Sequence, residues 1–201
     1  MNKAPVCIAI ATLLGLAATQ PLHAAEGPSF DCSKAQAGSI EQLICDDSSL
    51  AALDRQLAEV YSAAQKKAAN EQPPMLKAEQ RGWLSGRNEC WKEDDKNACV
   101  REAYSMRIAE LQARYRLAEM TSVITYACDN NRANELVVSH FSTSPATLIA
   151  DYGDSTSLMY QQTSTEGSQY RGRNESIAFN DDEAVVVWGY EATPMHCKSV
   201  N

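Results

Sequence analysis

The sequence has few of the residues and motifs on which catalytic and nucleotide-binding sites are built. It contains three histidines in 201 residues, and only His140 and His196 lie beyond the N-terminal segment. It has no G-x-S-x-G elbow, no Walker-type or G-x-G-x-x-G loop, and no H-E-x-x-H or C-x-x-C motif. The acidic runs 93–95 and 180–183 lack the spaced oxygen ligands and the turn glycine of a calcium loop. The sequence therefore predicts a protein that is not an enzyme and uses no cofactor or metal.

Positive charge is scarce as well. The chain has 18 basic and 26 acidic side chains, a formal net charge of −8, and no basic stripe. Phosphate would repel such a chain, which excludes nucleic acid as a partner. Residues 121–201 hold 4 basic and 10 acidic residues, so the C-terminal part is the more acidic one. This charge suits long-range attraction of a basic protein partner, although solubility alone would also explain it.

No apolar run is long enough to span a membrane. The longest, residues 6–18, has 13 residues, whereas a spanning helix needs about 20. It follows Lys3 and precedes the small residues Ala24 and Ala25, which is the pattern of a secretory signal peptide. Cleavage near Ala24 or Ala25 removes Cys7 and leaves six cysteines, an even number that favours disulfides. We therefore expect a periplasmic or secreted protein whose mature chain has no membrane span.

Apolar residues recur at helical spacing as far as about residue 120. The pattern predicts a short helix that begins with the capping box at Ser39 and a second helix that begins at Asp47 or Ser48. The second should end before Pro73, a third should run to Asn88, and a long final helix is marked by apolar residues from 100 to 115. Together they predict an antiparallel helical domain over residues 26–120.

From residue 121 the pattern alternates and is rich in β-branched and aromatic residues. The predicted strands are 123–128, 135–141, 147–152, 158–163, 168–170, 176–179, 183–190 and a short run near His196. In the seventh, Ala184, Val186, Trp188 and Tyr190 are expected to share one face. Such strands predict a small, closed or nearly closed, eight-stranded antiparallel β-barrel over residues 121–201. The predicted fold class is α+β, arranged as two domains.

The cysteines divide along the same boundary. Because the two domains are taken as independent, Cys128 and Cys197 should pair with each other and join the first strand to the last. For the helical domain we favour Cys32 with Cys45 and Cys90 with Cys99, so that each bridge clamps a junction between a loop and a helix. Bridges of this kind typically contribute about 2–4 kcal/mol each, a large share of the stability of a small domain.

Two family resemblances cover nearly all of the chain after the signal peptide. Residues 31–116 resemble the LprI-type lysozyme-inhibitor module through Cys32, Glu41-Gln42-Leu43-Ile44-Cys45, Leu53-Asp54, Trp83-Leu84, Arg87-Asn88, Cys90, Cys99, Tyr104 and Arg107-Ile108. Residues 123–198 resemble the C-type lysozyme inhibitors of the MliC/PliC kind through Tyr126-x-Cys128-Asp129, Leu136-x-Val138, Gly167-x-x-Tyr170, Glu183-Ala184 and Cys197. The resemblances imply a disulfide-clamped helical unit and an eight-stranded barrel. They also imply inhibition, without catalysis, by loops inserted into a lysozyme cleft.

The residues that this resemblance assigns to inhibition differ in the present chain. The family uses a Ser before Gly-x-x-Tyr and a Lys in a later loop, whereas Glu166 and Asn180 stand here. Lysozyme works with two carboxylates, so Glu166 would be repelled or would have to take up a proton. Nearby hydroxyl groups and two arginines could supply the donors and the positive charge instead. The predicted partner-binding residues are Ser164, Thr165, Glu166, Gly167, Ser168, Tyr170, Arg171, Arg173 and Asn180, with Gly167 and Tyr170 also open to a purely structural interpretation.

Three interpretations of function follow. The leading one is a periplasmic or secreted protein that binds and blocks a basic lysozyme or related muramidase. The replacements at Glu166 and Asn180 favour an alternative, an envelope binding or immunity-like module for a different cell-wall hydrolase or toxin. The third is a structural accessory protein without an inhibitory loop.

Overall fold

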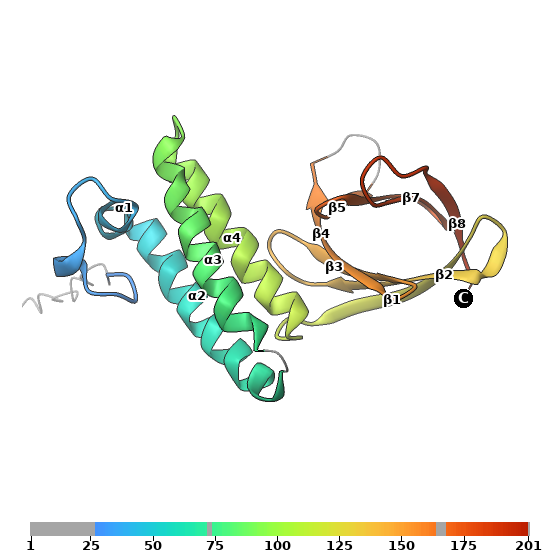
Figure 1. The fold of residues 1–201 in the computed structure, drawn as a ribbon, viewed down its shortest axis with the longest axis horizontal. Coiled ribbons are helices and arrows are strands. Elements are labelled where there is room, and N and C mark those ends of the chain that lie inside the picture. The colour runs from blue at the N-terminus through green and yellow to red at the C-terminus, as the bar shows by residue number, and fades with distance from the viewer. Residues whose placement is uncertain (1–26, 72–73, 164–167, 201) are drawn as a thin grey trace, which may run out of the picture.

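The computed structural model describes residues 27–71, 74–163 and 168–200. It consists of a group of helices followed by a β-barrel, and α4 is the helix that lies next to the barrel (Figure 1). The predicted signal peptide and its cleavage site near Ala24 or Ala25 lie outside the described residues. Within the described residues, no helix is long and apolar enough to cross a membrane.

The four predicted helices are present. Their bounds are α1 (Ile40–Asp46), α2 (Ser48–Lys67), α3 (Met75–Asn88) and α4 (Lys96–Arg114), with short 3₁₀ turns η1 (Cys32–Lys34), η2 (Ala68–Asn70) and η3 (Glu89–Lys92). Polar side chains cap three helix starts. They accept hydrogen bonds from backbone N–H groups of the first turn, which have no partner within the helix. The Ser39 hydroxyl accepts from the N–H of residue 42 at 3.2 Å, and Asp95 accepts from that of residue 98 at 2.9 Å. Asp47 caps α2 in the same way.

The helices bury one apolar core, and α2 and α4 form its main contact. The buried core residues are Ile40, Ile44, Leu50, Leu57, Ala64, Leu76, Cys90, Val100, Tyr104, Ile108 and Leu111. Two disulfides fasten the ends of this unit: Cys32–Cys45 ties η1 to α1, and Cys90–Cys99 ties η3 to α4. Both are the pairings that the sequence favoured.

The second part is a closed eight-stranded antiparallel barrel in the order β1 to β8. Its strands are β1 (Met120–Cys128), β2 (Asn131–Phe141), β3 (Thr147–Tyr152), β4 (Ser155–Gln162), β5 (Ser168–Arg171), β6 (Glu175–Asn180), β7 (Glu183–Trp188) and β8 (Met195–Ser199). Pairing of β1 with β8 closes the barrel, so that each described strand has a hydrogen-bonded neighbour on both sides. The Cys128–Cys197 disulfide links the same two strands.

Alternate residues of each strand fill the barrel interior, as the two-residue period of a strand requires. On β7 this confirms the predicted face for Ala184 and Val186, which are buried, and Trp188 packs against the same core. The prediction for Tyr190 is wrong, because its side chain is 79% exposed. The strand ends at Trp188, and Gly189 then adopts φ +110°, which turns the chain out of the sheet before Tyr190 is reached.

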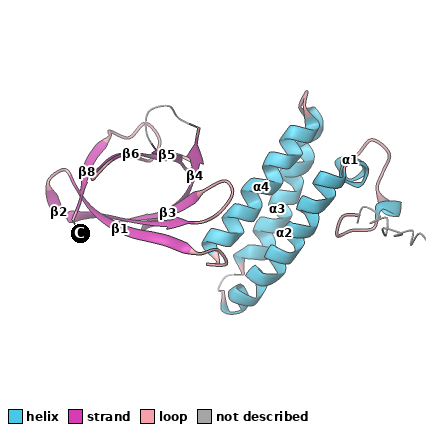
Figure 2. Ribbon diagram, turned by 180° about the vertical axis from the view of Figure 1, so that it is seen from behind, coloured by secondary structure: helices cyan, strands magenta, loops and turns pink. Residues whose placement is uncertain are grey.

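The helical part and the barrel share a small apolar contact. The buried residues Ala113 of α4, Phe141 of β2 and Leu158 of β4 form one cluster, with Ile149 and Tyr160 packed against it. The Tyr160 hydroxyl donates a hydrogen bond to the carbonyl of Met106 in α4 at 3.2 Å. The view from behind likewise places α4 beside the barrel (Figure 2). The two parts are therefore packed against each other as well as joined by the chain.

Candidate functional site

The strand register brings two of the predicted residues to one end of the barrel, which we call the loop end. β4 ends at Gln162 beside β5, and Ser168, the first residue of β5, pairs with Phe179 of β6. Asn180, the last residue of β6, pairs with Glu183 at the start of β7. Ser168 and Asn180 are thus on neighbouring strands at the same end. Four further predicted residues, Ser164, Thr165, Glu166 and Gly167, lie outside the described residues.

Most of the charged side chains described at the loop end are acidic. Asp181 and Asp182 form the exposed turn between β6 and β7, with Asp181 at φ +49°, and exposed Glu183 follows them. Lys198 of β8 lies 3.6 Å from the Glu183 carboxylate. Burial and, to a smaller extent, the charge of Asp182 raise the pKa of the Tyr126 hydroxyl inside the barrel. The negative potential at this end favours the approach of a basic protein surface.

Tyr170 points into the barrel. Its side chain is 7% exposed, and its ring lies 5.6 Å from that of His140 and 6.0 Å from that of Phe179, measured between centroids. Burial in this aromatic cluster lowers the pKa of His140. A side chain enclosed in this way supports β5 from within and presents almost no surface to another molecule. The structural interpretation of Tyr170 therefore has direct geometric support.

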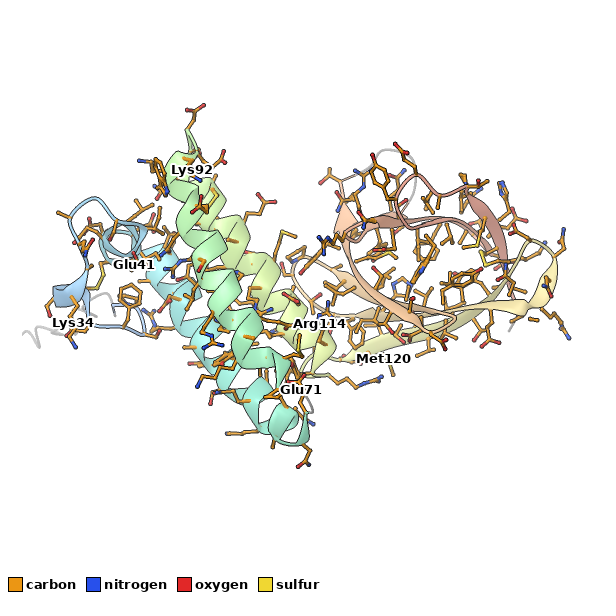
Figure 3. All side chains as sticks on the ribbon, in the orientation of Figure 1. Lys34, Glu41, Glu71, Lys92, Arg114 and Met120 are labelled. Carbon is orange, nitrogen blue, oxygen red and sulfur yellow. A yellow bond between two sulfur atoms is a disulfide. The ribbon has the colours of Figure 1, made fainter. Side chains whose placement is uncertain are left out.

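Arg171 and Arg173 lie on the outer face, at a cleft between α4 and the barrel that we call the junction cleft. Its volume is about 430 Å³, and its lining residues are Met106, Glu110, Arg114, Leu158, Tyr160, Gln162, Arg171, Gly172 and Arg173. Arg171 pairs with Tyr160 across the sheet. Arg114 comes from the last turn of α4, and Figure 3 labels it on the side of the helices that faces the barrel. The structure thus separates these two arginines from Ser168 and Asn180.

Gly172 holds the turn between β5 and β6 close to β4. A Cβ atom at this position would lie 2.6 Å from the Ser157 hydroxyl oxygen and 3.3 Å from the carbonyl oxygen of Leu158. The Gly172 N–H donates to the carbonyl of Glu175 at 2.8 Å. A side chain here would have to displace the Ser157 hydroxyl, so glycine allows the turn that carries the two flanking arginines to lie close to β4.

A second concavity, the aromatic groove, lies on the helical part. Its volume is about 630 Å³, and its lining includes Phe30, Leu57, Tyr61, Trp83 and Leu84. Polar groups of Glu41, Asp54 and Arg87 also line it. The sequence indicated several of these residues only as helix core positions. No local pattern marks the groove, because its lining comes from four segments that the fold brings together.

The polar groups of the aromatic groove are already paired with one another. The buried Arg87 guanidinium donates to Glu41 at 2.6 Å and to the Tyr104 hydroxyl at 2.7 Å. That hydroxyl donates to Asp54 at 2.7 Å, and Asp54 also accepts two hydrogen bonds from Ser29 at 2.6 Å. Burial raises the pKa of Tyr104 well above its ordinary value. Buried charges need hydrogen-bonding partners, and here the groups supply them to one another. We therefore interpret the arrangement as a structural network.

Comparison with known proteins follows the same division of the chain. Residues 32–111 match the family described as lysozyme inhibitor LprI, and residues 126–195 match the family described as membrane-bound lysozyme-inhibitor of c-type lysozyme. Proteins named lipoprotein LprI from Mycobacterium bovis and from two strains of Mycobacterium tuberculosis are 26% identical over 173 residues, which cover 86% of this chain and 85% of each relative. No solved structure matches the chain significantly. The chain therefore joins an LprI-like helical part to an MliC-like barrel, and both matched families are lysozyme inhibitors.

Proposed function

We propose that this protein is a non-catalytic inhibitor of a c-type lysozyme or related muramidase, acting in the periplasm or outside the cell. The observation that carries the proposal is that two inhibitor families match successive parts of one chain. The signal-peptide pattern of residues 1–25 and the three disulfides support an exported protein. We further propose two domains, 26–120 and 121–201, since the last helix ends at Arg114 and the first strand begins at Met120.

For the binding mode we propose that the loop end of the barrel faces the enzyme. Ser168, the first residue of β5, and Asn180, the last residue of β6, lie on neighbouring strands there. The acidic turn at Asp181 and Asp182 suits long-range attraction of a basic enzyme. Ser164, Thr165 and Ser168 carry hydroxyl groups that can donate hydrogen bonds to cleft carboxylates, and Glu166 and Gly167 lie among them in the sequence.

A turbidity assay tests the inhibitor proposal directly. Purified protein from which residues 1–25 are absent is added in micromolar excess to several c-type lysozymes acting on bacterial cell walls. We expect clearing to slow in proportion to the amount of protein added, with no release of sugar by the protein alone. A matched variant, Asp181→Asn with Asp182→Asn, should inhibit less well because it lacks two of the charges at the loop end. Full lysozyme activity at every ratio would reject the proposal.

The same acidic turn favours the alternative, an envelope or immunity-like module for a different cell-wall hydrolase or toxin. Asn180 and Asp181 stand where the resemblance implies a lysine, so the partner surface opposite this turn should differ from that of the usual enzyme. Affinity capture from envelope extracts separates the two candidates. Recovery of a glycan hydrolase without c-type lysozyme activity, together with full activity of c-type lysozymes in the turbidity assay, would favour the alternative.

A further inference from the structure

Both parts of the molecule contribute arginines to the junction cleft. Arg114 comes from the end of α4, whereas Arg171 ends β5 and Arg173 lies in the following turn. All three side chains are exposed. The side chains of Arg171 and Arg173 form no hydrogen bond or ion pair with any other residue that the structure describes. Two guanidinium groups are therefore open to a ligand.

The third arginine, Arg114, has a carboxylate partner, but the cleft still has an excess of positive charge. Arg114 contacts the Glu110 carboxylate at 3.1 Å, but the buried Arg107 already binds the other oxygen of that carboxylate at 2.8 Å. One carboxylate thus lies between two guanidinium groups. The Nη2 atom of Arg107 is buried and has no hydrogen-bond partner within the described residues.

The balance of charge at the cleft is opposite to that of the molecule. The lining carries three arginines and one glutamate, whereas the whole chain has a net charge of −8. Another carboxylate, that of Glu175, lies behind Gly172, where it accepts hydrogen bonds from Ser157 at 2.8 Å and from the N–H of Asn174 at 3.2 Å. The barrel has only four basic residues after position 120, and two of them are at this cleft. Their placement marks a local site within an acidic surface.

We propose that the junction cleft is a carboxylate-binding site, formed jointly by the helical part and the barrel, that receives an acidic side chain of a protein partner. Guanidinium groups present planar pairs of N–H donors that match the two oxygens of a carboxylate. The walls formed by Met106, Leu158 and Tyr160 reduce access of water and strengthen the attraction.

A protein partner is the source that the charges favour. A chain with net charge −8 attracts basic proteins. The acidic groups of such a partner would be repelled everywhere except at a positive site. The inference rests on the proposed function and deepens it. It adds a second contact with the partner, which is separate from the loop end and is formed by the helical part and the barrel together. It also gives the helical part a role in binding.

The first experiment tests the site without any enzyme. The side-chain N–H signals of arginines in the full protein are followed by NMR during titration with an acetylated and amidated triglutamate peptide. We expect saturable shifts for Arg114, Arg171 and Arg173. In the variant Arg171→Gln with Arg173→Gln, the signal of Arg114 remains and should no longer shift. The control variant Arg132→Gln with Lys66→Gln removes the same charge from exposed positions outside the cleft and should keep the shifts. Inorganic phosphate at equal concentration should compete poorly. Absence of shifts, or equal binding of phosphate, would overturn the proposal.

The second experiment measures binding to a lysozyme that the wild-type protein inhibits. Loss of the two barrel arginines should weaken binding at least about tenfold, as expected when one side of a close charge pair is removed. The Arg132 and Lys66 control should change it by less than about threefold. Arg114→Gln should weaken binding too, and less so when the barrel arginines are already absent. Equal binding by the cleft and control variants would overturn the inference and leave the inhibitor function intact. If no lysozyme binds at all, the proposed function fails, and the peptide titration still decides the site.

Discussion

At the scale of single residues, one hydroxyl joins the two charged groups buried under the aromatic groove. Tyr104 accepts a hydrogen bond from Arg87 and donates one to Asp54, each at 2.7 Å. Its ring packs edge-on against Trp83, with centroids 5.2 Å apart. The side chain therefore has an apolar role in the core and a polar role in the network, and these two roles can be tested separately.

Tyr104→Phe removes the polar role alone. The ring remains, but Arg87 and Asp54 each lose a partner in a buried place, so we expect a loss of about 1–3 kcal/mol in the free energy of unfolding. Urea denaturation of the two proteins measures the difference. Tyr61→Phe serves as the control, because the hydroxyl of Tyr61 has no hydrogen bond within the described residues, and should change stability by less than about 0.5 kcal/mol. Equal effects of the two changes would show that the network contributes nothing.

His140 should make the stability of the protein depend on pH. Burial lowers its pKa in the folded state, so the unfolded chain binds the proton more readily. Stability should therefore be fully present above the ordinary histidine pKa of about 6.5 and fall as the pH is lowered from there, by at most about 1.4 kcal/mol per pH unit, until the folded pKa is reached. His140→Gln should flatten this dependence, whereas His196→Gln at an exposed position should keep it. Thermal unfolding between pH 5 and 8 checks both.

At the scale of elements, the turn after β5 depends on a glycine. In Gly172→Ala the added methyl group would lie 2.6 Å from the Ser157 hydroxyl oxygen, which is itself hydrogen-bonded to Glu175. Overpacking of this kind typically costs about 1–3 kcal/mol. Gly82→Ala is the opposite case, since Gly82 lies inside α3 with nothing within 4 Å, and it should stabilise the protein by about 0.5–1 kcal/mol. Denaturation midpoints that move in the same direction would contradict this account.

The elements themselves could largely be predicted from the sequence. Helix α2 starts at Ser48, as the Asp47 cap and the apolar spacing indicated. The strands also lie close to the predicted ranges, because each buries one face and so keeps a two-residue period. The prediction for Tyr190 was wrong because the alternation of residues along a strand does not indicate where the strand ends. The backbone turn at Gly189 decides that point.

The binding surfaces were less predictable, for a physical reason. Arg171 and Arg173 could be selected from the sequence by their charge and their place near the loop. Arg114 could not, because its nearness to them depends on how α4 packs against the outer face of the barrel. The aromatic groove was missed in the same way. Local periodicity identifies the buried face of each element, whereas a cleft is defined by residues that are distant in the sequence.

At the scale of the whole molecule, the apolar contact between α4 and the barrel brings the two parts together at the junction cleft. It is small, since Ala113, Phe141 and Leu158 are its buried residues, and it adjoins the cleft through Leu158 and Tyr160. A charge placed in this cluster would have to be desolvated for the two parts to remain packed. Separating the parts is therefore the less costly response, because each retains its own core.

Phe141→Asp tests this coupling. Its side chain is 3% exposed and lies on the outer side of the barrel sheet, so the new carboxylate would be buried against α4. We expect one calorimetric transition in the wild type to split into two, and the radius of gyration measured by X-ray scattering to increase as the parts move apart. Val185→Asp, at an exposed position of β7, should change neither quantity. A single transition and an unchanged radius of gyration in Phe141→Asp would mean that this contact does not hold the two parts together. The contact would then not explain why both parts line the junction cleft.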